Sequence, residues 1–267
     1  MGQQRWNGDK CGSKEPALKA IGSFLLVCFL LLNAAAEMVA VPKGKFTTFF
    51  KGEGTDTIQI PSFFLDKYAV TNIQFNDFLK SHEHYRKSKV GRLFADVFYL
   101  KHWKADLLKK IEVKDFGEKP VTNVSWFVAR KYCESLGKRL PTISEWEYAS
   151  DGQSPLNEKI ILEWYGKTNE KESLKPVKKG AVNKFGLAGM HGQAWELVED
   201  FLTVMISSDS RSKGDRTDGF FCGGGSLTSR DASKYATFMR YAQRSSLRGN
   251  YSGQNLGFRC AKSMEEE

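Results

Sequence analysis

Helix-start signals in the first half of the chain constrain its fold class more than any other sequence feature. Thr71 and Thr142 each stand three residues before a glutamine or glutamate, which is the spacing of a capping box at a helix N-terminus. Ser125 begins a third stretch with helical apolar spacing. From Asp151 onward, glycine, polar residues and isolated apolar positions predict loops and short strands rather than helices. Helices in the first half and a loop-rich second half predict an α+β fold.

Residues 1–36 have the ordered parts of an export signal. Four basic residues precede a mainly apolar run from Ile21 to Leu32, and three alanines at 34–36 offer a cleavage site. The apolar run is shorter than the roughly 20 residues that a comfortable membrane span needs. We therefore expect residues 1–36 to be a signal peptide or an uncleaved anchor. Residues 37–267 are then expected to form a single domain.

Export changes the charge and cysteine content of the remaining chain. Without residues 1–36, 36 basic and 29 acidic residues leave a net charge of +7. This charge favours an acidic partner or surface, but the chain carries no identifiable nucleic-acid-binding module, so we expect no nucleic-acid partner. Cys133, Cys222 and Cys260 remain. In an oxidising compartment, three cysteines indicate one disulfide and one leftover thiol.

A series of motifs follows in fixed order from residue 38 to about residue 262. The motifs are residues 38–46, Asp66-Lys67-Tyr68, residues 120–126 (PVTNVSW), 137–142 (GKRLPT), 145–149 (EWEYA), 192–196 (GQAWE), 224–226 (GGS) and 255–260 (NLGFRC). Together they resemble the formylglycine-generating enzyme family, also called sulfatase-modifying factors. The resemblance implies that family's variant of the C-type-lectin fold, with little regular secondary structure around a small sheet.

The residue types within these motifs are interpreted mainly as fold determinants. Three indoles are expected to fill the core, each with an N–H group that needs a partner. These are the indoles of Trp126, Trp146 and Trp195. Arg139 and Arg259 lie among apolar and glycine neighbours, so buried ion pairs with motif glutamates are expected. The candidate partners are Glu145, Glu147 and Glu196.

The resemblance also implies where catalytic chemistry would lie. Active members of the family hold copper(I) with two cysteines five residues apart, and soft thiolates suit that ion. Counting back from Cys260, these positions are Asp231 and Ala236, and neither supplies a thiolate. We therefore expect no bound copper and no formylglycine synthesis. The family's substrate groove is expected at Trp195, Tyr235, Asp231 and Arg240.

Two further expectations follow from the resemblance. Cys133 and Cys260 match positions that form a disulfide in the family, which leaves Cys222 as the free thiol. The resemblance is compatible with one metal, a weakly bound calcium ion at Gln193 and Glu196. Glutamine can serve there because its side chain has a carbonyl oxygen.

Residues 80–119 form a basic insertion that contains three of the four histidines. His82, Glu83, His84 and His102 have the residue types of a two-histidine, one-carboxylate iron site. Lysines and arginines surround them in the sequence, which is a poor electrostatic field for a dication. A solvated basic surface loop is therefore the favoured interpretation.

Three function classes remain open at this point. The favoured one is a non-catalytic accessory or regulatory domain that binds a protein or peptide partner after export. The compartment would be the bacterial periplasm or cell envelope, or, in a eukaryote, the endoplasmic reticulum or the outside of the cell. Contact with a membrane is expected only if the N-terminal segment stays uncleaved.

The alternative is an oxidoreductase-type maturation enzyme of the same family that uses other residues. It would be similar to pyoverdine-maturation proteins or to the non-heme-iron ergothioneine synthases. The third class is a carbohydrate-binding module, which rests on fold analogy alone. A closed pocket with converging carboxylates would favour an enzyme, and an open groove would favour binding.

Overall fold

A computed structural model of the chain describes Gly2 and residues 37–47, 57–151, 154–166, 174–200 and 232–264. The expected signal segment lies outside these residues except for Gly2, and so does Cys222. Residues from Glu37 to the end belong to one compact unit. None of the helices in the described ranges is long and apolar enough to cross a lipid bilayer.

The described strands form three small sheets rather than one large sheet. In the largest, β4 (Phe63–Asp66) lies between β1 (Met38–Val41) and β7 (Ala261–Ser263), and both pairings are antiparallel. Leu65 of β4 is the register partner of Val39 on one side and of Ala261 on the other. The other two sheets are the antiparallel pair β2 (Gly44–Thr47) with β3 (Thr57–Ile60) and the parallel pair β5 (Trp195–Glu196) with β6 (Leu256–Gly257).

The helices of the first half begin where the sequence predicts. Both capping boxes are present, with Thr71 and Thr142 each accepting a hydrogen bond from the third residue of the helix. The Ser125 hydroxyl accepts from the backbone N–H of Val128. The three helices are α2 (Asn72–Ser81), α4 (Trp126–Ser135) and α5 (Ile143–Ser150). Small sheets and these helices confirm the α+β class.

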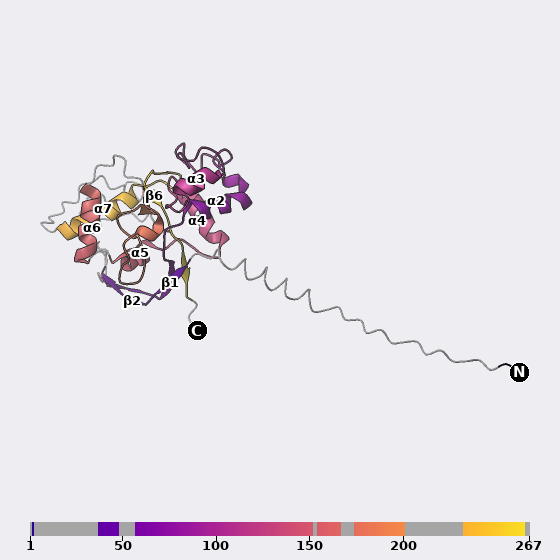
Figure 1. The fold of residues 1–267 in the computed structure, drawn as a ribbon. Helices are drawn as coiled ribbons and strands as arrows, with labels where there is room; N and C mark the ends of the chain where they lie inside the picture. The colour runs from indigo at the N-terminus through magenta and orange to yellow at the C-terminus, as the bar shows by residue number, and fades with distance from the viewer. Residues whose placement is uncertain are drawn as a thin grey trace, which may run out of the picture. The chain divides into compact units, whose positions relative to one another are not determined.

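The expectation that helices are lacking after Asp151 is wrong. This region contains α6 (Pro155–Gly166) and α7 (Ala232–Ser245), which lie next to each other in Figure 1. Ser154 precedes α6, and its carbonyl accepts the N–H of Glu158, so Ser154 and the following proline form a helix-start signal that the prediction overlooked. Among the α7 side chains that the structure describes, the buried ones are largely polar, so an inward apolar face does not mark this helix. Its buried residues include Thr237, Arg240, Tyr241 and Arg244.

The insertion at 80–119 is folded against the core. The expectation of a solvated basic surface loop is therefore wrong for its apolar residues. The insertion contains η2 (Glu83–Tyr85) and α3 (Lys110–Phe116), and its Leu100 and Trp103 are buried in the main core. The indole N–H of Trp103 donates to Oδ1 of Asn72 on α2 at 3.0 Å. Apolar side chains of the insertion thus anchor it, while most of its charged side chains face solvent.

The disulfide joins Cys133 of α4 to Cys260, the residue before β7, as the resemblance implied. Both cysteines are fully buried in the main core. The bridge connects residues 127 positions apart in sequence. Because a long closed loop loses much of its freedom in the unfolded chain, such a bridge stabilises the fold by about 4 kcal/mol in the chain-entropy model.

Candidate functional site

Two of the four residues expected in the family's groove line one small pocket. Trp195 comes from β5 and Arg240 from α7. Asp231 lies outside the described residues, and of Tyr235 and Ala236 the structure describes only their place in α7. The cavity measures about 10 Å³, which is room for about one water molecule. Its walls also include Trp146, Ile161, Trp164, Met190, His191, Ala194 and Glu196.

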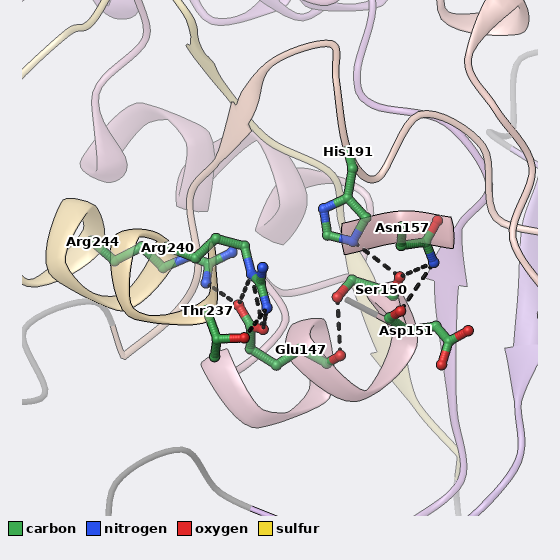
Figure 2. Close-up of polar contacts among 8 residues, drawn as sticks. All are labelled: Glu147, Ser150, Asp151, Asn157, His191, Thr237, Arg240 and Arg244. Atoms are coloured by element: carbon green, nitrogen blue, oxygen red, sulfur yellow. Dashed lines mark hydrogen bonds and ion pairs between the residues drawn. The ribbon is translucent and has the colours of Figure 1, made fainter. Parts of the chain in front are cut away.

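The Glu147 cluster, a buried ion-pair cluster (Figure 2), shares Arg240 with the lining of this pocket. It consists of Glu147 from α5 with Thr237, Arg240 and Arg244 from α7. Nη2 of Arg240 lies 2.8 Å from Oε2 of Glu147, and Nη1 of Arg244 lies 2.6 Å from Oε1. The three charged side chains are at most 2% exposed. Residues at i and i+4 of α7 therefore hold one carboxylate between two guanidinium groups.

The charges of the Glu147 cluster do not balance. Burial raises the pKa of Glu147, but the charges of Arg240 and Arg244 outweigh burial and lower this pKa to about 2. One carboxylate thus faces two permanently charged guanidinium groups. Arg244 also lies 4.2 Å above the Trp146 ring, a cation–π contact. Within the described part of the chain, Nε and Nη2 of Arg244 are buried without a hydrogen-bond partner.

His191 lines the same pocket, and the sequence analysis did not identify it. Its Nε2 lies 3.1 Å from the carbonyl oxygen of Ser150, so Nε2 carries the proton and Nδ1 is left as an acceptor. Burial, assisted by the charge of Arg240, lowers the pKa of His191 to about 4. The imidazole is therefore neutral at pH 7. His191 lies directly before the GQAWE motif and outside the basic insertion, and this position could have marked it as a site residue.

Glu196, the carboxylate that lines the pocket, is fully engaged. Arg259 contacts both of its oxygens at 2.8 Å, and the indole of Trp146 donates to Oε2 at 2.7 Å. This confirms a buried ion pair of Arg259 with a motif glutamate. Calcium at Gln193 and Glu196 would have to displace the arginine, so the donors present here do not fit that ion.

The remaining motif residues have structural roles. Arg139 forms a two-pronged ion pair with Glu145, with both N–O distances at 2.7 Å. The indole of Trp126 donates to the carbonyl of Val198 at 2.9 Å. Trp195 is half-buried, and its ring lies 5.1 Å from that of Trp164. Trp195 is therefore a pocket wall rather than a fully buried core residue.

The histidines of the insertion do not converge on one point. His82 stacks on Phe78, while Glu83 pairs with Lys89 at 2.8 Å. His102 lies instead between the amide oxygens of Asn72 and Asn123. Within the described ranges, no three His, Cys, Asp or Glu side chains are grouped so that they could hold a metal ion.

A second hollow is much larger. It has a volume of about 790 Å³ and lies between the insertion and the loop at 251–255. His102, Phe98 and Lys101 line it from the insertion, and Tyr251 lines it from the loop. We call it the insertion groove. The sequence gives no sign of this groove, because its two sides are about 150 residues apart in the chain.

The fold and the pocket define the class to which the chain belongs. It is a member of the family of sulfatase-modifying factor enzyme 1-like domains, whose family model matches residues 32–264. The chain is 29% identical to the formylglycine-generating enzyme of Streptomyces coelicolor, over 85% of this chain and 89% of that protein. It is 28% identical to the enzyme of Bos taurus, over 84% of this chain and 74% of that one.

Two further proteins are similar to this chain, one in sequence and one in structure. The chain is 26% identical to an inactive Cα-formylglycine-generating enzyme 2 of Bos taurus, over 43% of this chain and 49% of that protein. Among solved structures, PvdO from Pseudomonas aeruginosa matches with a TM-score of 0.51 and 20% identity, over 87% of this chain and 96% of that one. The match with PvdO establishes a shared fold.

Proposed function

We propose that this chain is an exported, non-catalytic member of the sulfatase-modifying factor family that binds a protein or peptide partner. Its first support is the residue content of the catalytic positions. Asp231 offers hard oxygen ligands and Ala236 offers none, so the pair does not fit copper(I). The family's oxidation of a substrate cysteine has no thiolate pair to start from at these positions.

The observation that carries the proposal is how the acidic side chains in and beside the small pocket are held. Glu147 is held by Arg240 and Arg244, and Glu196 is held by Arg259 and Trp146. Carboxylates that are paired in this way with buried guanidinium groups are not free to bind a metal, because a metal ion would have to displace those partners. With room for about one water molecule, the pocket is also too small for a substrate side chain.

The place of action in the proposal rests on the N-terminal segment. A basic stretch, an apolar run and small residues at 34–36 support export to a bacterial periplasm or cell envelope. The net charge of the remaining chain supports a partner with acidic groups.

One observation favours a second candidate, a maturation enzyme with chemistry of its own. His191 is a neutral imidazole whose Nδ1 has an acceptor lone pair, and the ring lines a pocket walled by tryptophans. A general base needs such an acceptor. The fold shared with PvdO is compatible with this candidate and does not by itself argue for it.

One experiment separates the two candidates. The purified full chain is incubated with copper and a sulfatase-type peptide that contains the target cysteine, and the peptide is examined by mass spectrometry. In parallel, chemical crosslinking in the exported fraction of the source cells identifies bound proteins. We expect an unchanged peptide and an unmodified partner in stoichiometric amount. Oxidised peptide, or a partner released in altered covalent form, would support an enzyme. Loss of that activity in His191→Gln would then identify the base.

A further inference from the structure

Exposed apolar side chains gather on one part of the surface. Eight large apolar side chains are exposed among the described residues, and five of them come from two short segments, 93–98 and 251. These are Leu93, Phe94, Val97, Phe98 and Tyr251. Backbone hydrogen bonds tie the two segments together, since the N–H of Asp96 donates to the carbonyl of Asn250 at 2.9 Å. Concentrated exposed apolar area marks an interaction site more often than scattered residues do.

Phe98 and Tyr251 connect this apolar surface to the insertion groove, because both also line the groove. The ammonium group of Lys101 lies 4.9 Å above the Phe98 ring, so a cation and an aromatic ring stand together at the entrance. The exposed or half-buried amides of Gln254 and Asn255 line the groove as well. Such amides are able to bond the peptide groups of an extended chain.

His102, in the groove, occupies an unusual position between two hydrogen-bond acceptors. Its Nδ1 lies 3.3 Å from Oδ1 of Asn123, and its Nε2 lies 3.3 Å from Oδ1 of Asn72. Neighbours fix both amide orientations. The Asn123 amide nitrogen donates to the Ser252 carbonyl at 3.1 Å, and Oδ1 of Asn72 accepts from the Trp103 indole. A neutral imidazole donates only one hydrogen bond, so only the protonated ring donates to both oxygens.

Protonation of His102 has an electrostatic cost in the free protein. Burial lowers the pKa of His102, and the charge of Lys87 lowers it further, while the hydrogen bond to Asn123 and the charge of Glu112 act in the opposite direction. The insertion as a whole carries 11 lysines and arginines against six acidic residues. A negatively charged ligand in the groove would offset this positive field and favour the doubly bonded imidazolium.

We propose that the insertion groove, and not the small pocket at Trp195, holds the partner of this chain through an extended acidic peptide segment. The apolar side chains of this peptide segment lie over Phe98 and Tyr251, and the carboxylates of the segment face Lys101 and His102. This proposal rests on the proposed function, which requires a protein or peptide partner. A hollow that is lined by polar side chains suits a chain that enters it better than it suits a flat membrane surface.

The test uses three fluorescein-labelled decapeptides and the full chain, with binding followed by fluorescence anisotropy. The first peptide alternates glutamate with leucine and phenylalanine, the second replaces each glutamate by glutamine, and the third replaces each apolar residue by serine. We expect only the first to bind well. Phe98→Ser and Lys101→Glu should each weaken its binding about tenfold. Matched controls are Ile111→Ser, an exposed apolar residue on α3, and Lys159→Glu, an exposed lysine on α6.

The pH dependence gives a second readout that fold damage alone would not produce. Binding should strengthen as the pH falls from 7.5 to 5.5, because a bound carboxylate favours protonated His102. This dependence should disappear in His102→Gln. Equal binding of the glutamine peptide, equal binding by all variants, or no binding of the acidic peptide would overturn the proposal. Stronger binding to heparin or to vesicles of anionic lipid, with Phe98→Ser unaffected, would also overturn it.

Failure of this proposal is distinguishable from failure of the proposed function. If the crosslinked partner is retained by Phe98→Ser and Lys101→Glu, the groove is not its site, but the chain still binds a partner. If the wild-type chain yields no partner and oxidises the sulfatase-type peptide, the proposed function itself is wrong.

Discussion

The Glu147 cluster and the insertion groove both concentrate positive charge, but they differ in what surrounds that charge. In the cluster, Arg240 and Arg244 are buried and paired with a carboxylate that the fold itself supplies. In the groove, Lys101 is exposed and stands beside an aromatic ring and an imidazole at the mouth of a large hollow. Buried charge that is paired within the fold is not available to a ligand, whereas exposed charge beside apolar surface is available. Substitutions in the two regions should therefore act on different properties.

The largest effect is expected from Glu147→Gln. This substitution leaves the guanidinium groups of Arg240 and Arg244 buried without their carboxylate, which should lower the free energy of unfolding by about 5 kcal/mol. Urea denaturation measures the change. Glu163→Gln on the exposed face of α6 is the matched control and should change stability by less than about 0.5 kcal/mol. A loss below about 1 kcal/mol in Glu147→Gln would mean that the cluster is not what stabilises the fold.

Removing the disulfide should have the next largest effect. Cys133→Ser with Cys260→Ser frees a loop of more than 100 residues in the unfolded chain, and we expect a loss of about 4 kcal/mol. Cys222→Ser serves as the control, because it removes a thiol but no disulfide. A non-reduced peptide map in which Cys222 is paired with either of the other two cysteines would contradict this assignment.

A pH titration of stability isolates His191. Its pKa of about 4 in the folded protein lies below the ordinary value of 6.5, so the unfolded chain binds the proton more readily. The contribution of neutral His191 to the free energy of unfolding is complete above pH 6.5. It falls by about 3 kcal/mol as the pH falls toward 4. His191→Gln should flatten the curve in this window, whereas His84→Gln, at an exposed position, should leave it unchanged. An identical slope for wild type and His191→Gln would show that another group is responsible.

The smallest effect on stability is expected in the insertion groove. Phe98→Ser and Lys101→Glu alter exposed side chains, so each should change the free energy of unfolding by less than about 0.5 kcal/mol while weakening peptide binding. The same urea denaturation measures this. A loss of 2 kcal/mol or more would indicate that these side chains support the fold, and the contrast between the two regions would not hold.

The sequence predicted features whose signals are local or whose partners lie in motifs. Capping residues such as Thr142 act on the helix that directly follows them, and Arg259 lies in a motif with evident buried neighbours. It did not predict α7, because guanidinium groups occupy the buried face where apolar residues are normally expected. It also misjudged the insertion, because the partner of Trp103 is Asn72, 31 residues earlier, and only the folded structure brings the two together.

The insertion groove could not be predicted for the same reason. Its floor combines Asn123 with Ser252, which are 129 residues apart, and a carboxamide side chain has no local signal that distinguishes a groove from a turn. His191 is a different case. It lies directly before a motif that was identified, so proximity in sequence could have flagged it as a pocket residue.

We propose that this chain keeps the family's scaffold without its copper chemistry. Competition against a chromogenic copper(I) chelator tests it most directly, with Asp231→Cys/Ala236→Cys as the positive control. We expect the wild-type chain to leave the chelator's copper in place and the double variant to withdraw some of it, because the variant restores two thiolates at the family's spacing. Tight copper(I) binding by the wild-type chain would contradict the account.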